Sequence, residues 1–286
     1  MAKQTSRRNT KKDTRARNGQ SRAAAADKYH LYQQTVQEAD HEVAFFDRVY
    51  RAMFKRSPRV LREDFCGTFA VCCEWAKKRG RIAVGVDNDA EPLEWGRKHN
   101  LSKLPEAGQE RVELRQQDVR KVDKGPKADV LSAQNFSFWC FQSRRELLAY
   151  FKAAHANCAG ESVMVLDMMG GPECIEAERV DERRLRTYTY LWEQARFDPV
   201  TSTGTWHIHF HFNDGSKLDR AFTYDWRFWT IPEVRELLDE AGFDETHVYW
   251  EGADENGDGD GNWRRVRTGT NDPAWIAYIV AVRRKR

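Results

Sequence analysis

Short apolar runs alternate with amphipathic runs from residue 59 to residue 167, and this rhythm leaves few folds open to the chain. The apolar runs have the length of strands, while the runs between them repeat apolar residues with the period of a helix. Because parallel strands need a crossover between them, the alternation predicts a parallel sheet with helices on both faces. The expected strands are Arg59–Phe65, Ile82–Val86, Val112–Gln116, Val130–Ala133 and Ser162–Asp167, and the expected helices are Ala70–Lys78, Glu91–His99 and Arg144–Ala156.

A different pattern follows the fifth expected strand. Residues 186–228 are rich in aromatic residues, Thr and His and are divided by turn signals, which predicts an insertion of antiparallel hairpins. A helix over residues 231–241 and two strands, over residues 246–251 and 275–282, come next. We expect a Rossmann-like, mostly parallel seven-stranded α/β sheet, with the 186–228 insertion as a lid over the substrate.

The basic charge of the chain is concentrated at its N-terminus. Residues 1–26 carry eight Lys or Arg against one acid, Asp13, whereas the whole chain of 286 residues has a formal net charge of only +3. This segment also lacks apolar periodicity, so we expect a disordered basic tail followed by one domain over residues 27–286. Such a tail suits weak contact with RNA or, alternatively, targeting to an organelle.

The sequence predicts neither a membrane helix nor a secretory signal, because no apolar run approaches roughly 18 residues. The six cysteines form no CxxC pair and no zinc-type quartet, which is typical of reduced, buried thiols. We therefore expect a cytoplasmic protein without a bound metal, or an organellar protein if residues 1–26 are a transit peptide.

Polar residues stand where the expected parallel strands end, which is the edge at which open α/β sheets bind ligands. Asp87 follows the second strand, 20 residues after Gly67, and its two oxygens suit the two hydroxyls of a ribose. Asp118 suits the exocyclic amine of a purine, with the Val119 amide beside it for a ring nitrogen, and Glu63 suits a cationic amino group. This set favours an adenosine that carries a charged amino acid over a dinucleotide, whose pyrophosphate needs several glycines.

Five segments, LREDFCGTF, AVGVDNDAEPLEWGRKHN, LRQQDV, ADVLSAQNFSF and GESVMVLDMMGG, follow one another in an order that resembles the class I S-adenosylmethionine-dependent methyltransferases over residues 27–170. The first motif of that family reads acid-x-Gly-x-Gly-x-Gly. Here it is a DFCGT variant, with Phe65 and Phe69 at the first and third glycine positions. The resemblance implies S-adenosyl-L-methionine as the cofactor. The cofactor-binding residues that it implies are Glu63, Phe65, Cys66, Gly67, Asp87, Asn88, Asp118, Val119 and Gln134.

The residues after the fourth strand bear on the acceptor of the methyl group. They read Gln134-Asn135-Phe136, without the Asn/Asp-Pro-Pro-aromatic turn with which the family handles adenine or glutamine nitrogens. The chain also has no Pro-Cys dipeptide for cytosine C5 chemistry. We predict that Asn135 orients a substrate amide or hydroxyl, with plain turn packing as the alternative.

Three histidines alternate along the TWHIHFHF run of the insertion. Because side chains alternate along a strand, His207, His209 and His211 share one face. One of them, His209, is a candidate general base, and a plain polar face is the alternative. Residues two apart on a strand lie about 6.5–7 Å from each other, so we do not expect all three to bind one metal ion.

The insertion, together with the residue directly after it, also carries aromatic side chains that are expected either to be buried or to line a pocket for a planar or cationic substrate. These residues are Tyr188, Tyr190, Trp192, Tyr224, Trp226 and Trp229. The sequence therefore predicts a methyltransferase that acts on a small molecule or on a side-chain nucleophile. One alternative is an RNA- or ribosome-associated methyltransferase that uses the basic tail, and another is a non-catalytic binding protein with the same fold. The oligomeric state stays open.

Overall fold

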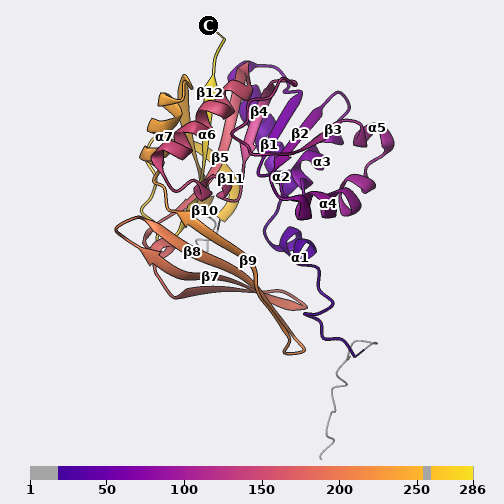
Figure 1. The fold of residues 1–286 in the computed structure, drawn as a ribbon. Helices are drawn as coiled ribbons and strands as arrows, with labels where there is room; N and C mark the ends of the chain where they lie inside the picture. Colours follow the sequence, from indigo (N-terminus) through magenta and orange to yellow (C-terminus); the bar gives the residue numbers. More distant parts are fainter. Residues whose placement is uncertain (1–18, 254–258, 286) are drawn as a thin grey trace, which may run out of the picture.

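The computed structural model of the chain describes residues 19–253 and 259–285 (Figure 1). Most of the predicted basic tail, residues 1–18, lies outside this part. The backbone amides of Arg22 and Ala23, near the end of that tail, donate hydrogen bonds to the side chains of Asp214 and Ser216. Among the described residues, no helix combines the length and the apolar content needed to span a bilayer.

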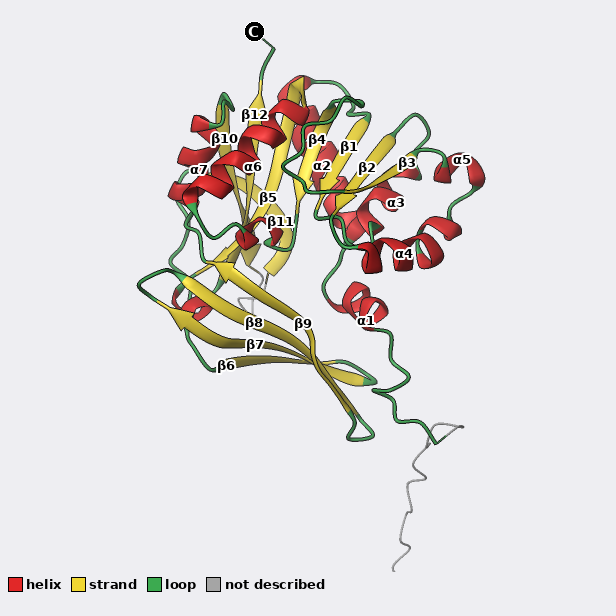
Figure 2. Cartoon of the chain, viewed as in Figure 1, coloured by secondary structure: helices red, strands yellow, loops and turns green. Residues whose placement is uncertain are grey.

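The main sheet, sheet A, contains β1 (Val60–Asp64), β2 (Ile82–Asp87), β3 (Val112–Gln116), β4 (Ala128–Ala133), β5 (Cys158–Gly170), β10 (Glu245–Ala253), β11 (Gly259–Val266) and β12 (Trp275–Arg283). Their order across the sheet is β11-β10-β12-β5-β4-β1-β2-β3 (Figure 2). The strands β1 to β5 pair in parallel, whereas β12 is antiparallel to both β5 and β10. The prediction of a Rossmann-like, mostly parallel α/β sheet is confirmed.

The predicted number of seven strands is wrong, because β11 adds an eighth strand at the edge of sheet A. This strand comes from an acidic, glycine-rich run with the composition of a loop. It pairs with β10 in a hairpin, and its Trp263 side chain is buried against Phe45 and Tyr278. One buried aromatic residue produces no apolar alternation, so the sequence pattern did not indicate a strand.

Helices cover both faces of sheet A, as the alternation predicts. The helices are α1 (Lys28–Thr35), α2 (Ala39–Phe54), α3 (Ala70–Ala76), α4 (Ala90–His99), α5 (Glu106–Gln109), α6 (Arg144–Asn157) and α7 (Ile231–Glu240), with 3₁₀ turns η1 (Leu101–Lys103), η2 (Ser137–Cys140) and η3 (Pro172–Ile175). The helices α2 and α3 contribute to one hydrophobic core, and α6 and α7 to a second. In α2, Phe45, Phe46, Val49 and Tyr50 recur at helical spacing and are buried, which fixes this helix on the sheet.

A second sheet, sheet B, contains β6 (Arg179–Arg184), β7 (Tyr188–Asp198), β8 (Thr203–Phe212) and β9 (Lys217–Arg227), paired antiparallel in this order. Three of its strands lie within the predicted insertion, and β6 precedes it. In Figure 1 sheet B lies across the lower end of sheet A, next to α1. Residues after β4 and at the end of β5 share a cavity with residues of sheet B. Sheet B therefore covers the edge at which the parallel strands end.

Candidate cofactor and substrate site

The loop after β1 has positive φ angles at the three positions where the family motif has glycine, although only Gly67 is a glycine here. Phe65, Gly67 and Phe69 have φ angles of 56°, 50° and 47°, all in the left-handed region. A residue with a Cβ atom is less stable in this conformation by about 1–2 kcal/mol. Contacts elsewhere in the fold must therefore hold the two phenylalanines in place.

Both phenylalanine rings pack behind the loop. Phe69 is fully buried against Gly96 of α4, where an added Cβ would come within 2.4 Å of the Phe69 Cε1 atom. The Phe65 ring is partly buried, with its centroid 5.9 Å from that of Phe141 and 5.5 Å from that of Tyr150. Full burial of a phenylalanine side chain contributes about 1.5–3 kcal/mol, which is enough to offset the unfavourable backbone conformation of Phe69.

Asp87 and Gly67, which the sequence pairs by spacing, lie in direct contact. The Gly67 amide donates to Asp87 Oδ2 at 2.8 Å, and the Asp89 amide donates to Asp87 Oδ1 at 2.9 Å. Burial raises the pKa of Asp87, and these two amides oppose the shift. Asn88, between Asp87 and Asp89 in the sequence, is exposed. Asp87 therefore joins the end of β2 to the loop after β1.

Glu63 is buried at the end of β1, where the Cys72 amide donates to its Oε2 atom at 3.0 Å. This bond satisfies an amide of the first turn of α3, so Glu63 stabilises the fold as well as the site. Burial raises the pKa of Glu63 to about 7. Cys66 is buried too, and its amide donates to the Val86 carbonyl at 3.1 Å.

The other predicted cofactor residues differ in exposure. Asp118 is exposed and forms an ion pair with Arg120 at 2.6 Å, and the hydrogen bond from Arg120 lowers the pKa of Asp118. Val119 is buried beside it. Gln134 is also buried; its Nε2 donates to the Val165 carbonyl at 2.9 Å, and its Oε1 has no hydrogen-bond partner among the described residues.

Two acids at the same edge were not predicted from the sequence: Glu42 is buried and Asp167 is partly buried. Glu42 lies in α2, and burial, with Glu63 and Asp167 nearby, raises its pKa well above the usual range. Asp167, in the C-terminal part of β5, accepts hydrogen bonds from the amides of Asn135 at 2.7 Å and Phe136 at 2.9 Å, and burial raises its pKa to about 7. The sequence did contain an indication of each acid, because Glu42 lies on the apolar face of a helix and Asp167 is the last residue of an expected strand.

The acids Glu42, Glu63 and Asp167 suit a cationic ligand. Within the part of the chain that the structure describes, Glu42 Oε2 is buried without a hydrogen-bond partner. A buried acceptor of this kind is unfavourable unless a donor reaches it. An ammonium group supplies such donors, and a positive charge beside the three carboxyl groups favours their ionised forms. The residues present therefore fit an amino acid that carries an ammonium and a sulfonium group.

A cavity of about 480 Å³ lies between sheet A and sheet B. Asn135 and Phe136 form part of its wall on the side of sheet A, and Asp181 and Glu251 add carboxyl groups. Its volume is in the usual range for small-molecule sites. The aromatic side chains that line it are Tyr32, Phe136, Tyr190, Trp192, Tyr224, Trp226 and Trp275.

The aromatic residues predicted in and directly after the insertion divide into two groups. Tyr190, Trp192, Tyr224 and Trp226 line the cavity. Tyr188 and Trp229 are buried in the cores, where the Tyr188 hydroxyl lies 2.8 Å from Thr35 Oγ1 and the Trp229 indole donates to the Phe141 carbonyl at 3.2 Å.

The two predicted catalytic residues face different surroundings. Asn135 lines the cavity, with a φ angle of 57°. His209 follows Ile208 on β8, and because Ile208 lines the cavity, the alternation of side chains turns His209 to the opposite face of sheet B. There its Nε2 lies 2.9 Å from Glu193 Oε2. The predicted role of His209 as a general base does not fit this geometry.

The strand order and the crossovers define the class I methyltransferase fold, and solved structures with this fold are similar to the chain. Amino pentose methyltransferase CalS10 from Micromonospora echinaspora, bound to S-adenosylmethionine, has a TM-score of 0.64 and 19% identity, covering 89% of this chain and 95% of that one. Sugar N-methyltransferase KedS8 from a Streptoalloteichus species has a TM-score of 0.61 and 16% identity, covering 96% and 99%.

An S-adenosylmethionine-dependent methyltransferase from Clostridium acetobutylicum is similar as well, with a TM-score of 0.63, 15% identity and coverage of 90% of this chain and 98% of that one. These likenesses establish the fold. No protein-family model matches the chain, and no curated protein matches it.

Proposed function

We propose that the chain is an S-adenosylmethionine-dependent methyltransferase that methylates an amine nitrogen of a small molecule. The observation that carries the proposal is an aromatic cavity of about 480 Å³ that adjoins the acid-rich edge of sheet A at Asn135 and Phe136. The similar structures CalS10 and KedS8 are described as methyltransferases of an amino pentose and of a sugar nitrogen, which supports an amine acceptor.

The cofactor would be held by residues from several strand ends. Glu63 and Glu42 would accept hydrogen bonds from its ammonium group, and Asp87 from its ribose hydroxyls. Asp118 would accept from the adenine amine, which requires it to give up part of its ion pair with Arg120. When bound, S-adenosylmethionine supplies a methyl group on a positively charged sulfur, which is already a good leaving group.

The residues of the chain itself therefore need to align the amine and receive its proton. The aromatic faces of Trp192, Tyr224 and Trp226 favour an amine that becomes a substituted ammonium. Asp181 and Glu251 offer acceptors for its N–H or O–H groups. Asn135, on the sheet A side of the cavity, is the residue that we assign to orienting the acceptor.

Cofactor binding is tested by calorimetry with S-adenosylmethionine and with its demethylated product. We expect the parent protein to bind both and Asp87→Asn to bind about tenfold more weakly, since one lost hydrogen bond to a charged group is worth about 1.5 kcal/mol. Asp89→Asn is the matched control, because asparagine at this N-cap still accepts from the Glu91 amide. If the parent protein binds neither compound, the non-catalytic alternative replaces this proposal.

The acceptor atom is tested with a labelled methyl group and pairs of small sugars that differ only in an amino or a hydroxyl group. We expect label on the amino compounds alone. Label on the hydroxyl compounds alone would refute the amine assignment while leaving a methyltransferase. The RNA-associated alternative rests on a tail of which residues 1–18 lie outside the described part, and none of the comparisons supports it.

A further inference from the structure

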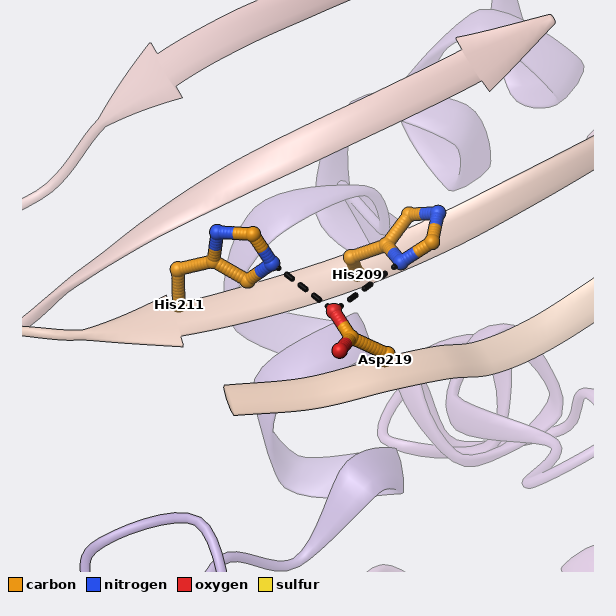
Figure 3. A group of neighbouring side chains, drawn as sticks. All are labelled: His209, His211 and Asp219. Carbon is orange, nitrogen blue, oxygen red and sulfur yellow. Dashed lines mark hydrogen bonds and ion pairs between the residues drawn. The ribbon is translucent and has the colours of Figure 1, made fainter. Parts of the chain in front are cut away.

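The outer face of sheet B, opposite the cavity, carries a cluster of two histidines and an acid (Figure 3). His209 and His211 come from β8 and Asp219 comes from β9. The Asp219 Oδ1 atom lies 2.8 Å from His211 Nε2 and 3.4 Å from His209 Nδ1. The methyl transfer proposed above uses none of these side chains.

A bulge in β9 places Asp219 against the histidines. Ile208 pairs with Phe222 and Phe210 pairs with Leu218, so residues 219–221 stand opposite His209 alone. Within the bulge, Arg220 has a φ angle of 50°, a conformation that is unfavourable for a residue with a side chain. Bulges often redirect a side chain next to a functional site, and this one turns Asp219 toward both imidazoles.

Glu193, a carboxylate on the neighbouring strand β7, orients His209. Its Nε2 lies 2.9 Å from Glu193 Oε2 of β7, while its Nδ1 accepts a hydrogen bond from the Arg220 amide at 3.1 Å. This pattern assigns the ring proton to Nε2 and the lone pair to Nδ1, so a metal ion at Nδ1 would replace the hydrogen bond from the Arg220 amide. Histidines that bind metals usually donate their other ring N–H to a carboxylate, a backbone carbonyl or a water, and Glu193 supplies a carboxylate at this place.

We propose that His209 Nδ1, His211 Nε2 and the Asp219 carboxylate bind one divalent transition-metal ion of the zinc type. Two imidazoles and a carboxylate are a common donor set for such ions, with a fourth position open to solvent. Ligand atoms about 2.0–2.1 Å from a tetrahedral ion stand about 3.4 Å apart. The His209–Asp219 distance of 3.4 Å already has this value, and the closer His211–Asp219 pair is free to separate because both side chains are partly exposed.

This site needs only two of the three histidines. His207 Nδ1 forms a hydrogen bond with Thr223 Oγ1 at 2.9 Å, and His207 is not part of the cluster. The candidate ligand atoms of His209, His211 and Asp219 lie within 4.8 Å of one another, so side-chain rotation must bring the two nitrogens toward the separation of about 3.4 Å of a tetrahedral site. Because Ile208 of the same strand lines the cavity, a bound ion stabilises sheet B directly behind the proposed substrate site.

The test uses the untagged full chain, freed of metal by a chelator, with Zn²⁺ followed by calorimetry. We expect one ion per chain, with affinity reduced at least tenfold in His211→Gln and in Asp219→Asn. Glu193→Gln reduces it about 10–100-fold, the usual effect of removing such a partner. His99→Gln, an exposed histidine stacked on Trp95, is the control and leaves the affinity unchanged.

Co²⁺ binding, followed by its absorption, identifies the ligands. Ligand-field bands without a thiolate charge-transfer band are expected for nitrogen and oxygen donors. A thiolate band would assign the ion to a cysteine such as the exposed Cys140 and would overturn the proposal. Absence of saturable Zn²⁺ binding, or undiminished binding in His211→Gln, would overturn it as well. Circular dichroism confirms that each variant is folded. If Asp219→Asn is unfolded, the Zn²⁺ affinity of His211→Gln alone decides the test.

Discussion

Replacing Gly96 with alanine tests whether α4 holds the loop after β1 in its left-handed conformation. In an ordinary helix interior this change is stabilising by about 0.8–1.0 kcal/mol. Here the new Cβ would lie 2.4 Å from Phe69 Cε1 and 2.5 Å from the Thr68 carbonyl oxygen, so the ring and the backbone must both move. Overpacking of this kind is unfavourable by about 1–3 kcal/mol. The net result is a loss of stability of up to about 2 kcal/mol.

The same change should also weaken cofactor binding. The Thr68 carbonyl also accepts a hydrogen bond from Asn100 Nδ2 at 2.8 Å. Thr68 ends the segment Cys66-Gly67-Thr68, in which the Gly67 amide donates to Asp87. Loss of one cofactor hydrogen bond, worth about 1 kcal/mol, lowers the affinity about fivefold.

Urea denaturation measures the free energy of unfolding of Gly96→Ala, and calorimetry with demethylated S-adenosylmethionine measures its affinity. Lys98→Ala, an exposed position on the same helix, is the control and should change the stability by no more than about 0.5 kcal/mol. If Gly96→Ala is more stable than the parent by the full helix-propensity increment and binds the cofactor product equally well, α4 does not hold the loop.

Three further outcomes are expected. Burial holds the pKa of Glu63 and of Asp167 at about 7, above the ordinary 4.5 and 3.8. The folded state therefore binds protons that the unfolded state has released, and the stability from these groups is present below about pH 4 and lost as the pH rises through about 7. Urea denaturation across this range should show a shallower decline for Glu63→Gln and for Asp167→Asn, and an unchanged decline would contradict the assignment. Trp226→Leu removes an aromatic face of the cavity, so the KM for an amine substrate should rise several-fold, by about 0.5–2 kcal/mol in binding, with cofactor affinity unchanged in calorimetry. Trp263→Ala should lower the free energy of unfolding by about 3–5 kcal/mol, as for other buried aromatic residues, and a value within the range of surface substitutions would show that this side chain does not anchor β11.

The main sheet and part of the site were predictable because they depend on local patterns. Alternation of apolar runs indicates the parallel strands, and the rule that ligands bind at strand ends directs attention to Glu63, Asp87 and Asp118. The spacing of one strand–helix–strand unit places Asp87 beside Gly67, and the structure has this contact at 2.8 Å.

Features that depend on contacts between distant segments were not predictable in this way. Glu42 reaches the acids of the sheet only because α2 packs across it. The face of sheet B that covers the cavity is the one that carries Ile208. Alternation along β8 shows that His209 lies on the other face, but the sequence does not say which of the two faces turns toward sheet A.

The DFCGT motif shows why residue identity is a weak guide to this loop. A search for glycines counts Phe65 and Phe69 as departures, yet both have positive φ angles, in the region that glycine favours. The compensation for Phe69 lies in Gly96 of α4, 27 residues further along the chain, where the missing side chain makes room for the ring. Burial of the Phe69 ring and partial burial of the Phe65 ring support positive φ angles that glycine would adopt without strain.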